Sequence, residues 1–298
     1  MNILLTGGTG LIGTALIQHW QPQHKLFVLT RSERKAKRLW GDTVTTVSDL
    51  ADVNFNQLNA VVNLAGEPIA GKRWTTKQKQ ILCDSRWQLT EKLVSAINMA
   101  NTPPAILISG SAVGYYGRQH QQLISEDYQH VHDEFTHQLC KRWEELALAV
   151  NPATRVCILR TGIVLAKNGG ALAKMLPAFR LGLGGRIGDG GQYMSWIHLD
   201  DMVALTDFLL QHPTLQGPFN ATAPNPVTNT EFSASLARQL HRPALLPMPA
   251  AVISMLLGEM AELLLTGQRV LPTNLVKAGY RFRFDTLSTA LANLLPQK

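Results

Sequence analysis

The chain has 298 residues, of which 45% are hydrophobic and 16% are charged, a balance typical of a chain with a sizeable buried core and not of a disordered one. Its 28 lysines and arginines outnumber its 21 aspartates and glutamates, so the net charge is +7. This length allows one large domain or a large and a small one, and it excludes a short peptide module.

We infer the expected cell compartment from sequence signals of secretion, membrane insertion and disulfide bonding that we do not find. No basic and apolar leader precedes the first strand-like run, and acidic residues interrupt the longest apolar region, at residues 247–265. The three cysteines are scattered without C-x-x-C spacing, which indicates neither a disulfide framework nor a zinc site. We therefore expect a cytoplasmic protein that does not bind to a membrane.

The first half of the chain alternates β-branched runs with longer helical patterns, which is typical of a parallel sheet covered by helices. The predicted strands are Asn2–Thr6, Leu26–Thr30, Val44–Val47, Ala60–Leu64, Ala105–Ser109 and Arg155–Arg160. The predicted helices between them are Leu11–Trp20, Trp74–Ala100 and His132–Val150. This alternation predicts an α/β fold with a doubly wound parallel sheet, known as a Rossmann fold.

The second half begins with glycine-rich loops at residues 167–170 and 182–191. Three further helices are predicted, at about Asp200–Gln211, Thr230–Leu240 and Ala250–Leu265. We predict a dinucleotide-binding domain over residues 1–165, to which later segments return. Residues 166–298 are predicted to form a substrate lobe and a small C-terminal helical region.

A glycine-rich run, TGGTGLIG at residues 6–13, joins the first strand to the first helix. In this context Gly7 permits a tight turn, Gly10 lets the backbone approach a pyrophosphate, and Gly13 lets the helix pack closely on the strand. The free N–H groups and the dipole of the helix N-terminus favour phosphate. The predicted cofactor contacts here are Gly7, Gly8, Thr9, Gly10, Leu11, Ile12 and Gly13. The alternative is an ordinary glycine turn.

The end of the second strand indicates which dinucleotide binds. An NAD site would place an acidic residue there on the ribose 2′-hydroxyl, but the sequence reads Thr30-Arg31-Ser32. Arg31 can form paired hydrogen bonds to a 2′-phosphate, so NADP is favoured over NAD. The basic residues that follow are interpreted as a solvated helix face.

The fourth strand is followed by small residues. Because ligands cross the carboxyl ends of the strands in an open α/β sheet, Leu64, Ala65 and Gly66 are predicted to line the cofactor site. Arg86 on the following helix is predicted to face the same region, with a surface position as the alternative.

Further motifs carry a family resemblance. They are Ser109-Gly110-Ser111, Tyr115-Tyr116-Gly117, Leu159-Arg160-Thr161-Gly162 and the run at residues 196–201. With them, the chain resembles the extended short-chain dehydrogenase/reductase superfamily, which includes nucleotide-sugar epimerases. Residues 63–67, 182–185 and 265–272 narrow the resemblance to its atypical, YfcH-type "epimerase family" branch. The resemblance implies an NADP-dependent oxidoreductase or epimerase that acts on a small polar or nucleotide-sugar substrate.

The superfamily mechanism uses a Ser or Thr after the fifth strand and a Y-x-x-x-K pair on the next helix. The Lys holds the nicotinamide ribose and tunes the Tyr for proton transfer. No Tyr in this chain has a Lys four residues later. At the expected place, His137 and Lys141 keep the spacing, but His replaces Tyr.

Three alternatives follow from this departure. In one, His137 transfers the proton while Ser111 orients the substrate oxygen. In another, Tyr115 or Tyr116 replaces the lost phenol. In the third, Lys141 only positions the cofactor, and the chain is a catalytically impaired NADP-binding regulatory or interaction protein.

The sequence indicates neither a metal site nor nucleic-acid binding. His130, His132 and His137 are close in sequence but lack the flanking ligands of a metal site. The net charge alone, without a basic face interleaved with aromatic residues, does not predict nucleic-acid binding. We expect a monomer or a homodimer, because superfamily relatives often dimerise through their two long helices.

Overall fold

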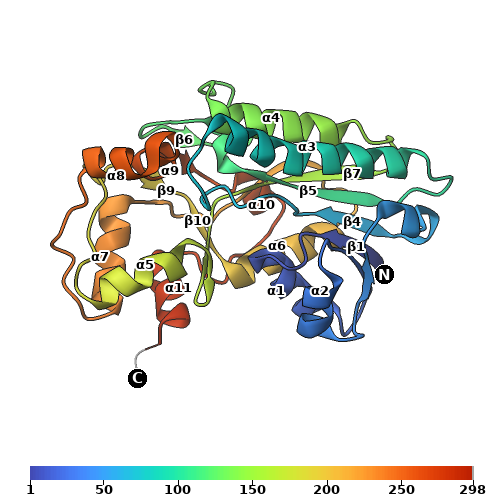
Figure 1. The fold of residues 1–298 in the computed structure, drawn as a ribbon, viewed down its shortest axis with the longest axis horizontal. Coiled ribbons are helices and arrows are strands. Elements are labelled where there is room, and N and C mark those ends of the chain that lie inside the picture. The colour runs from blue at the N-terminus through green and yellow to red at the C-terminus, as the bar shows by residue number, and fades with distance from the viewer. Residues whose placement is uncertain (297–298) are drawn as a thin grey trace.

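The computed structural model describes residues 1–296 and has a seven-stranded parallel sheet at its centre (Figure 1). The sheet has the strand order β11-β7-β5-β4-β1-β2-β3. Its strands are β1 (Asn2–Thr6), β2 (Lys25–Leu29), β3 (Thr45–Val47), β4 (Ala60–Asn63), β5 (Ile106–Ala112), β7 (Arg155–Thr161) and β11 (Gly217–Ala221). The predicted strands of the first half are confirmed, and the fold is a Rossmann-like α/β fold.

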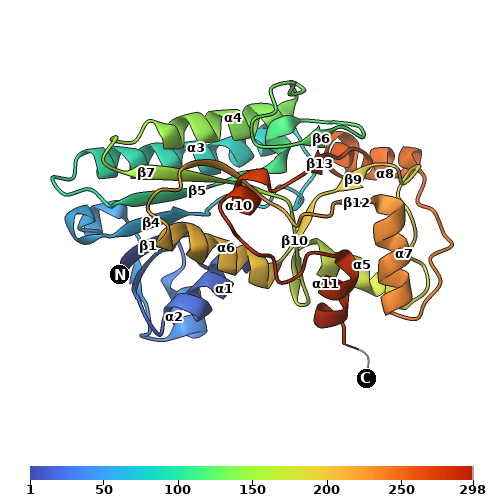
Figure 2. The same cartoon turned by 180° about the vertical axis from the view of Figure 1, so that it is seen from behind.

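Helices cover both faces of this sheet (Figures 1 and 2). One face carries α1 (Leu11–Trp20), α2 (Glu33–Trp40) and α6 (Leu199–Gln211), and the other carries α3 (Thr76–Asn98) and α4 (Phe135–Leu148). Each face of the sheet has its own hydrophobic core, and alternate side chains of β1 pack into one or the other. Ile3 and Leu5 pack toward α1 and α6, whereas Leu4 packs toward α3. Because such strands are buried on both faces, they appear in the sequence as near-continuous apolar runs.

The strand order reverses between β1 and β4, which is where open α/β sheets bind ligands at the carboxyl ends of their strands. The ends of these two strands are held in register by buried side chains. The Thr6 hydroxyl donates to Asn63 Oδ1 at 2.7 Å, and Asn63 Nδ2 donates to Thr90 Oγ1 at 2.8 Å. The glycine turn after β1 and residues 64–66 after β4 therefore lie side by side.

The remaining elements form a lobe at the other end of the molecule and the segments that connect it (Figure 2). The helices of the lobe and of its connecting segments are α5 (Gly170–Arg180), α7 (Asn229–Gln239), α8 (Ala250–Leu257), α9 (Glu262–Leu265), α10 (Thr273–Lys277) and α11 (Leu287–Leu294). Short strands accompany them: β6 (Leu123–Ile124), β8 (Ile163–Ala166), β9 (Tyr193–Met194), β10 (Trp196–His198), β12 (Val227–Thr228) and β13 (Arg269–Val270). A separate core that includes Phe179, Trp196 and Phe232 stabilises this lobe.

The chain passes back and forth between the sheet domain and the lobe. After β8, β9 and β10 have entered the lobe, α6 packs on α1 and β11 pairs with β7 at the edge of the large sheet. The chain then returns to the lobe with α7.

Two details of the second half differ from the sequence-based expectation. The prediction of one helix over Ala250–Leu265 is wrong, because Gly258 has a φ of +60° and ends α8 before a 3₁₀ turn at Gly258–Ala261. The helix α5 was not predicted, since glycine-rich loops flank it and Pro177 lies inside it. Among the helices within residues 1–296, none is long and apolar enough to cross a membrane.

Candidate functional site

The turn after β1 depends on glycine at two positions. Gly7 has a φ of +71°, and a Cβ there would lie 2.7 Å from the Leu64 carbonyl carbon. A Cβ on Gly13 would lie 2.3 Å from the Gly7 carbonyl oxygen. Both distances are too short for real atoms, so these glycines allow β1, α1 and the end of β4 to approach closely.

The start of α1 has free hydrogen-bond donors. Gly10 is its exposed N-cap, no side chain caps the helix, and its first turn contains no acidic residue. The first N–H groups of a helix lack intrahelical partners, and the helix dipole adds positive potential. A Cβ on Gly10 would meet only the Gly7 carbonyl oxygen, at 3.2 Å, within 4 Å. An anion can therefore approach this turn closely.

The loop between β8 and α5 covers part of the same turn. A Cβ on Gly169 would lie 2.8 Å from a methyl carbon of Leu11. Of the other predicted contacts, Gly8 is buried against Val28, and Thr9 and Ile12 are half-buried. The lobe thus contacts the glycine turn directly.

The end of β2 presents an unpaired arginine. The Thr30 hydroxyl accepts a hydrogen bond from the Ser32 N–H at 3.1 Å, which shapes the turn into α2. Arg31 and Ser32 are exposed, and within residues 1–296 Arg31 makes no side-chain hydrogen bond or ion pair. Its guanidinium group is available to a ligand.

The residues after β4 form a supported wall. The Ala65 N–H donates to the Thr6 hydroxyl at 3.2 Å. Arg86 reaches from α3 and donates to the carbonyl oxygens of Leu82 and Glu67, each at 3.0 Å. A Cβ on Gly66 would lie 2.8 Å from Arg86 Cζ, so the small size of Gly66 makes room for this side chain. Arg86 therefore braces the wall, and its burial lowers its pKa.

A buried ionic cluster lies beside the end of β5. The Ser111 hydroxyl donates to Glu144 Oε1 at 2.6 Å. Glu144 in turn accepts two hydrogen bonds from Arg160 on β7, at 2.9 and 2.8 Å. All three residues are buried, so the Ser111 hydroxyl is engaged by Glu144. Glu144 was not predicted as a site residue, and Arg160 was noted only as part of the motif Leu159-Arg160-Thr161-Gly162. The available signal was a lone arginine inside an apolar strand.

The two neighbouring tyrosines differ in accessibility. Tyr116 is fully buried, and its hydroxyl donates to Asn220 Oδ1 at 2.7 Å and accepts from Arg160 at 3.0 Å. Burial raises the pKa of Tyr116 to about 12, so the phenol stays neutral. Tyr115 is half-buried, with its ring centroid 3.5 Å from the Arg160 guanidinium carbon. The described residues offer no hydrogen bond to the Tyr115 hydroxyl.

His137 and Lys141 lie one turn apart on α4 in different surroundings. His137 is buried, and its Nδ1 is hydrogen-bonded to the Tyr115 carbonyl oxygen, an acceptor that requires Nδ1 to carry the proton. Lys141 is exposed and, among the described residues, has no hydrogen-bond or ion-pair partner.

Arg269 on β13 was missed as a candidate. Its guanidinium lies over the Tyr193 ring at 4.9 Å, and its buried Nε has no hydrogen-bond partner. Its other side-chain nitrogens also make no hydrogen bond within residues 1–296. A buried, unpaired guanidinium N–H is costly, which favours a ligand acceptor here. The segment 265–272 pointed to the family but not to this role.

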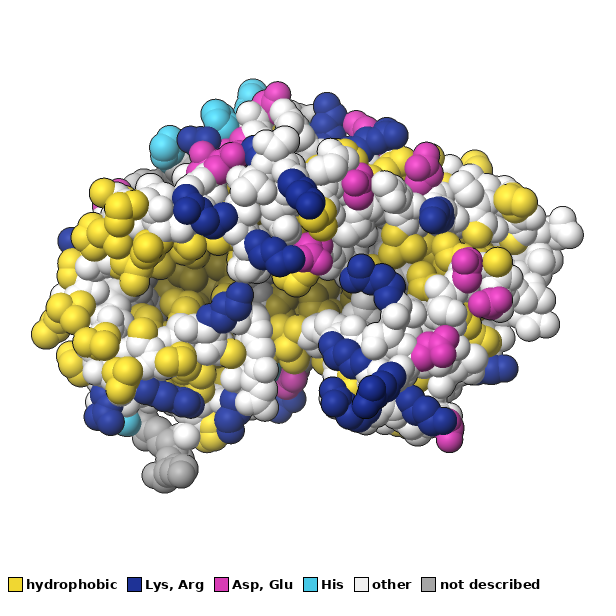
Figure 3. Space-filling view, viewed as in Figure 1, with side chains coloured by type: hydrophobic (Ala, Val, Ile, Leu, Met, Phe, Trp, Pro, Cys, Tyr) yellow, Lys and Arg dark blue, Asp and Glu magenta, His cyan; other side chains and the backbone are white. Residues whose placement is uncertain are grey.

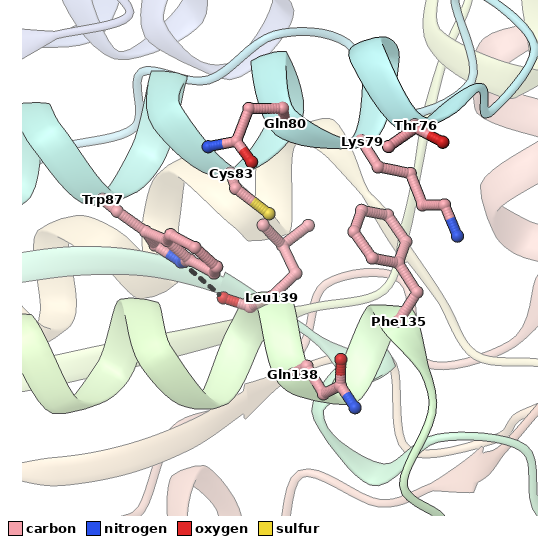
Figure 4. Close-up of a pocket in the computed structure, with 8 residues that line it drawn as sticks. All are labelled: Thr76, Lys79, Gln80, Cys83, Trp87, Phe135, Gln138 and Leu139. Carbon is pink, nitrogen blue, oxygen red and sulfur yellow. Dashed lines mark hydrogen bonds between the residues drawn. The ribbon is translucent and has the colours of Figure 1, made fainter.

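An open pocket lies between α3 and α4 (Figure 4). It has a volume of about 280 Å³ and an apolar floor that includes Cys83, Phe135 and Leu139. None of the predicted cofactor residues lines it. Figure 3 shows a different apolar hollow, between the C-terminal lobe and the rest of the molecule, with lysines and arginines around it. Within residues 1–296, no group of three or more His, Cys, Asp or Glu residues could hold a metal ion.

The strand order and the glycine turn define a protein of the Rossmann-fold class. Residues 3–221 match the profile of the NAD dependent epimerase/dehydratase family, and residues 248–294 match a domain of unknown function, DUF1731. The chain belongs to the NAD dependent epimerase/dehydratase family.

Full-length relatives support this assignment. The chloroplastic "Epimerase family protein SDR39U1 homolog" of Arabidopsis thaliana is 38% identical over 99% of this chain and 87% of its own length. A crystal structure of the human epimerase family protein SDR39U1 (isoform 2) with NADPH has a TM-score of 0.92 and 34% identity, covering 100% of both chains. A nucleoside-diphosphate sugar epimerase from Corynebacterium glutamicum has a TM-score of 0.77 and 25% identity, covering 99% of this chain and 58% of that one. The resemblance to the epimerase family branch is thereby confirmed.

Proposed function

We propose that this protein binds NADP(H) across the carboxyl ends of β1, β2 and β4. The free guanidinium of Arg31 beside the glycine turn carries the proposal, because it can pair with a 2′-phosphate where an NAD site would place a carboxylate. The human relative that was crystallised with NADPH supports it.

The residues present fit such a cofactor. The backbone of residues 7–13 would hold the diphosphate, and Thr30, Arg31 and Ser32 would surround the 2′-phosphate. Leu64, Ala65 and Gly66, braced by Arg86, would form the wall near the nicotinamide ribose. When bound, the nicotinamide supplies a hydride donor or acceptor.

Calorimetric titration with NADPH and NADH tests this assignment. We expect Arg31→Ala to weaken NADPH binding by about 1.5–3 kcal/mol, the range for a hydrogen bond to a charged group, and to leave NADH binding nearly unchanged. Arg38→Ala removes an exposed arginine from the last turn of α2 and serves as the matched control. Equal effects of the two substitutions would contradict the role of Arg31.

We further propose that the protein is an oxidoreductase or epimerase acting on a small polar substrate that carries an anionic group, such as a nucleotide sugar. The unpaired Arg269 supports an anionic group, and the similar structure of a nucleoside-diphosphate sugar epimerase supports this substrate class. For proton transfer, the half-buried Tyr115 hydroxyl is better placed than that of Tyr116, which is buried and hydrogen-bonded. Lys141 would hold the ribose.

Turnover is tested by following the loss of NADPH absorbance with carbonyl compounds and, because epimerisation leaves the cofactor unchanged overall, by chromatography of the products formed from sugar nucleotides. We expect Tyr115→Phe to abolish activity without weakening NADPH binding, and Arg269→Gln to raise KM for the anionic substrate. Tyr128→Phe removes another tyrosine hydroxyl, one that bonds Gln119, and is the matched control. Full activity of Tyr115→Phe would exclude Tyr115 from proton transfer and would leave His137 as the candidate.

A second candidate function is an NADP-binding regulatory or interaction protein. It is favoured by the engagement of the Ser111 and Tyr116 hydroxyls in the buried cluster, which leaves neither free for a substrate. Tight NADPH binding without turnover on any panel compound would support it, and turnover abolished by Lys141→Ala would exclude it. A cytoplasmic location remains a prediction, supported by three buried free cysteines.

A further inference from the structure

The C-terminal lobe exposes an unusually apolar surface. Residues 243–256, which lead into and form most of α8, contain no charged residue, and most of them are exposed. Leu245 is 80% exposed and Met255 is 72% exposed. Monomeric proteins rarely leave contiguous apolar patches of this kind without an interaction partner.

A second segment adds to the same surface. The chain around Leu181 and Leu183 runs alongside residues 242–250: Met248 N–H donates to the Arg186 carbonyl at 2.8 Å, and Gly188 N–H donates to the Met248 carbonyl at 2.9 Å. Leu181 is itself 74% exposed. Figure 3 shows hydrophobic side chains gathered at this end of the molecule. We call the exposed residues Leu181, Leu183, Leu245, Leu246, Met248, Val252, Met255 and Leu256 the apolar face.

The charged residues within the two segments of the apolar face are arginines, and acidic residues begin just beyond these segments. Arg180, Arg186 and Arg242 are exposed on its two segments, and Arg242 Nε donates to the Arg180 carbonyl oxygen at 3.0 Å. No aspartate or glutamate occurs in residues 146–188 or 232–258, the stretches that carry the face. The nearest acidic residues in the chain are Asp189, Glu231 and Glu259, beyond the ends of these stretches.

We infer that the apolar face docks this protein on the surface of a membrane that contains anionic lipids. Exposed leucine and methionine side chains insert at the boundary between headgroups and acyl chains, and the arginines pair with lipid phosphates. A second copy of the chain is a poorer occupant, because the two segments carry three exposed arginines and no carboxylate, so two copies of the face would bring like charges together. This association is peripheral and needs no spanning helix, and it departs from the expectation, drawn from the sequence, that the protein does not bind to a membrane.

Flotation with lipid vesicles tests the inference. We expect the wild-type protein to bind vesicles of phosphatidylcholine mixed with phosphatidylglycerol, and to bind pure phosphatidylcholine more weakly. The double variant Leu245→Asp/Met255→Asp should lower binding at least about tenfold, since burial of one such side chain contributes about that factor. Arg180→Gln/Arg186→Gln should lower it by about fivefold for each arginine.

The controls are matched in exposure. Met99→Asp changes an 85% exposed methionine that follows α3, and Lys92→Gln removes an exposed cation from α3. Thermal unfolding checks that every variant folds. The inference is overturned if the wild type does not bind anionic vesicles, or if Met99→Asp lowers binding as much as the double variant does. It is also overturned if sedimentation shows a dimer that the double variant dissociates, because the apolar face is then an interface between copies.

Discussion

A methyl group at position 13 has no room in this fold, although alanine normally stabilises a helix relative to glycine by about 1 kcal/mol. The Cβ would lie 2.3 Å from the Gly7 carbonyl oxygen, which belongs to the backbone and cannot move without opening the turn. We expect Gly13→Ala to lower the free energy of unfolding by about 2–3 kcal/mol and to weaken NADPH binding.

Denaturant unfolding and NADPH titration check this expectation. Gly191→Ala is the control, because a Cβ there would lie 3.5 Å from the flexible Asp189 side chain, an ordinary contact. A Gly13→Ala variant as stable as the wild type would mean that α1 shifts freely against β1.

The buried phenol of Tyr116 gives stability a dependence on pH. Its pKa is raised from 10.0 to about 12 because burial disfavours the phenolate. Between these values the unfolded chain loses a proton that the folded chain keeps, so stability falls as pH rises, by at most about 2–3 kcal/mol from this group. Urea unfolding at intervals across this range should show a smaller loss for Tyr116→Phe than for the wild type.

Other groups titrate in the same range, so the comparison between variant and wild type is the informative quantity. Burial also raises the pKa of Cys140 and of Cys157, each to about 11. Tyr128→Phe alters a partly buried tyrosine and should follow the wild-type curve. If Tyr116→Phe also follows it, the phenol is solvated in the folded protein.

The roles of residues within a local sequence motif could be predicted, whereas roles that depend on contacts between distant segments could not. Gly7 and Gly13 are recognisable because a strand, a turn and a helix follow one another directly in the chain. Ser111, by contrast, meets Glu144 from α4 and Arg160 from β7, so its engagement depends on the packing of three elements. For Gly66 the predicted benefit was room for a ligand, whereas the Arg86 side chain takes that space.

At the scale of elements, the N-terminus of α6 holds the C-terminal segment in place. Asp201 is buried and accepts hydrogen bonds from the N–H groups of Arg283 at 2.8 Å and Phe284 at 2.9 Å. The Tyr280 hydroxyl donates to the Asp201 carbonyl oxygen at 3.1 Å. Asp201 therefore has a structural role: it joins the start of α6 to the segment before α11.

We expect Asp201→Asn to cost about 1.5–3 kcal/mol, because an amide replaces a carboxylate that accepts two buried hydrogen bonds. Thermal unfolding measures the loss, and hydrogen exchange should show weaker protection at residues 283–294. Asp200→Asn changes the neighbouring, largely exposed carboxylate and should cost less than about 1 kcal/mol. Equal costs for the two substitutions would contradict the role of Asp201.

The helix breaks were harder to predict than the helices. Apolar residues continue on both sides of Gly258, so periodicity alone extends one helix to residue 265. Gly258 ends α8 with a φ of +60°, a conformation that glycine adopts readily at the C-terminus of a helix. The glycine was therefore the available local signal for the break, and the apolar pattern around it masked that signal.

At the scale of the whole molecule, a small apolar cluster joins the lobe to the sheet domain. Trp74 in the loop before α3 packs with Leu82 on α3 and with Met260 from the lobe, and its ring meets Phe135 edge to face at 5.0 Å. The indole N–H donates to the Ile69 carbonyl at 2.9 Å. This cluster lies beside the N-terminal ends of α3 and α4.

Trp74→Ala should lower the free energy of unfolding by about 3–5 kcal/mol and loosen the lobe against the sheet domain. Denaturant unfolding gives the first quantity, and limited proteolysis between residues 64 and 76 reports the second. Lys79→Ala removes the partly exposed ion pair with Glu259 and the contact of the Lys79 ammonium with the Phe135 ring, 5.2 Å from its centroid, and should cost at most about 1–2 kcal/mol. If Lys79→Ala proves as costly as Trp74→Ala, charge and not apolar packing holds the two parts together.

The interleaved chain order limits how such a protein can be recombined. The lobe receives β8, α5, β9 and β10, and the chain then returns to the sheet for α6 and β11. It next builds α7, α8 and α9 in the lobe, returns to the sheet with α10, which packs on β11, and ends in the lobe with α11. A single crossover between two related genes would therefore always combine halves of two different lobes or split the sheet. Exchange of the whole lobe between homologues requires its separate segments to be transferred together while residues 199–221 and 273–280 are retained.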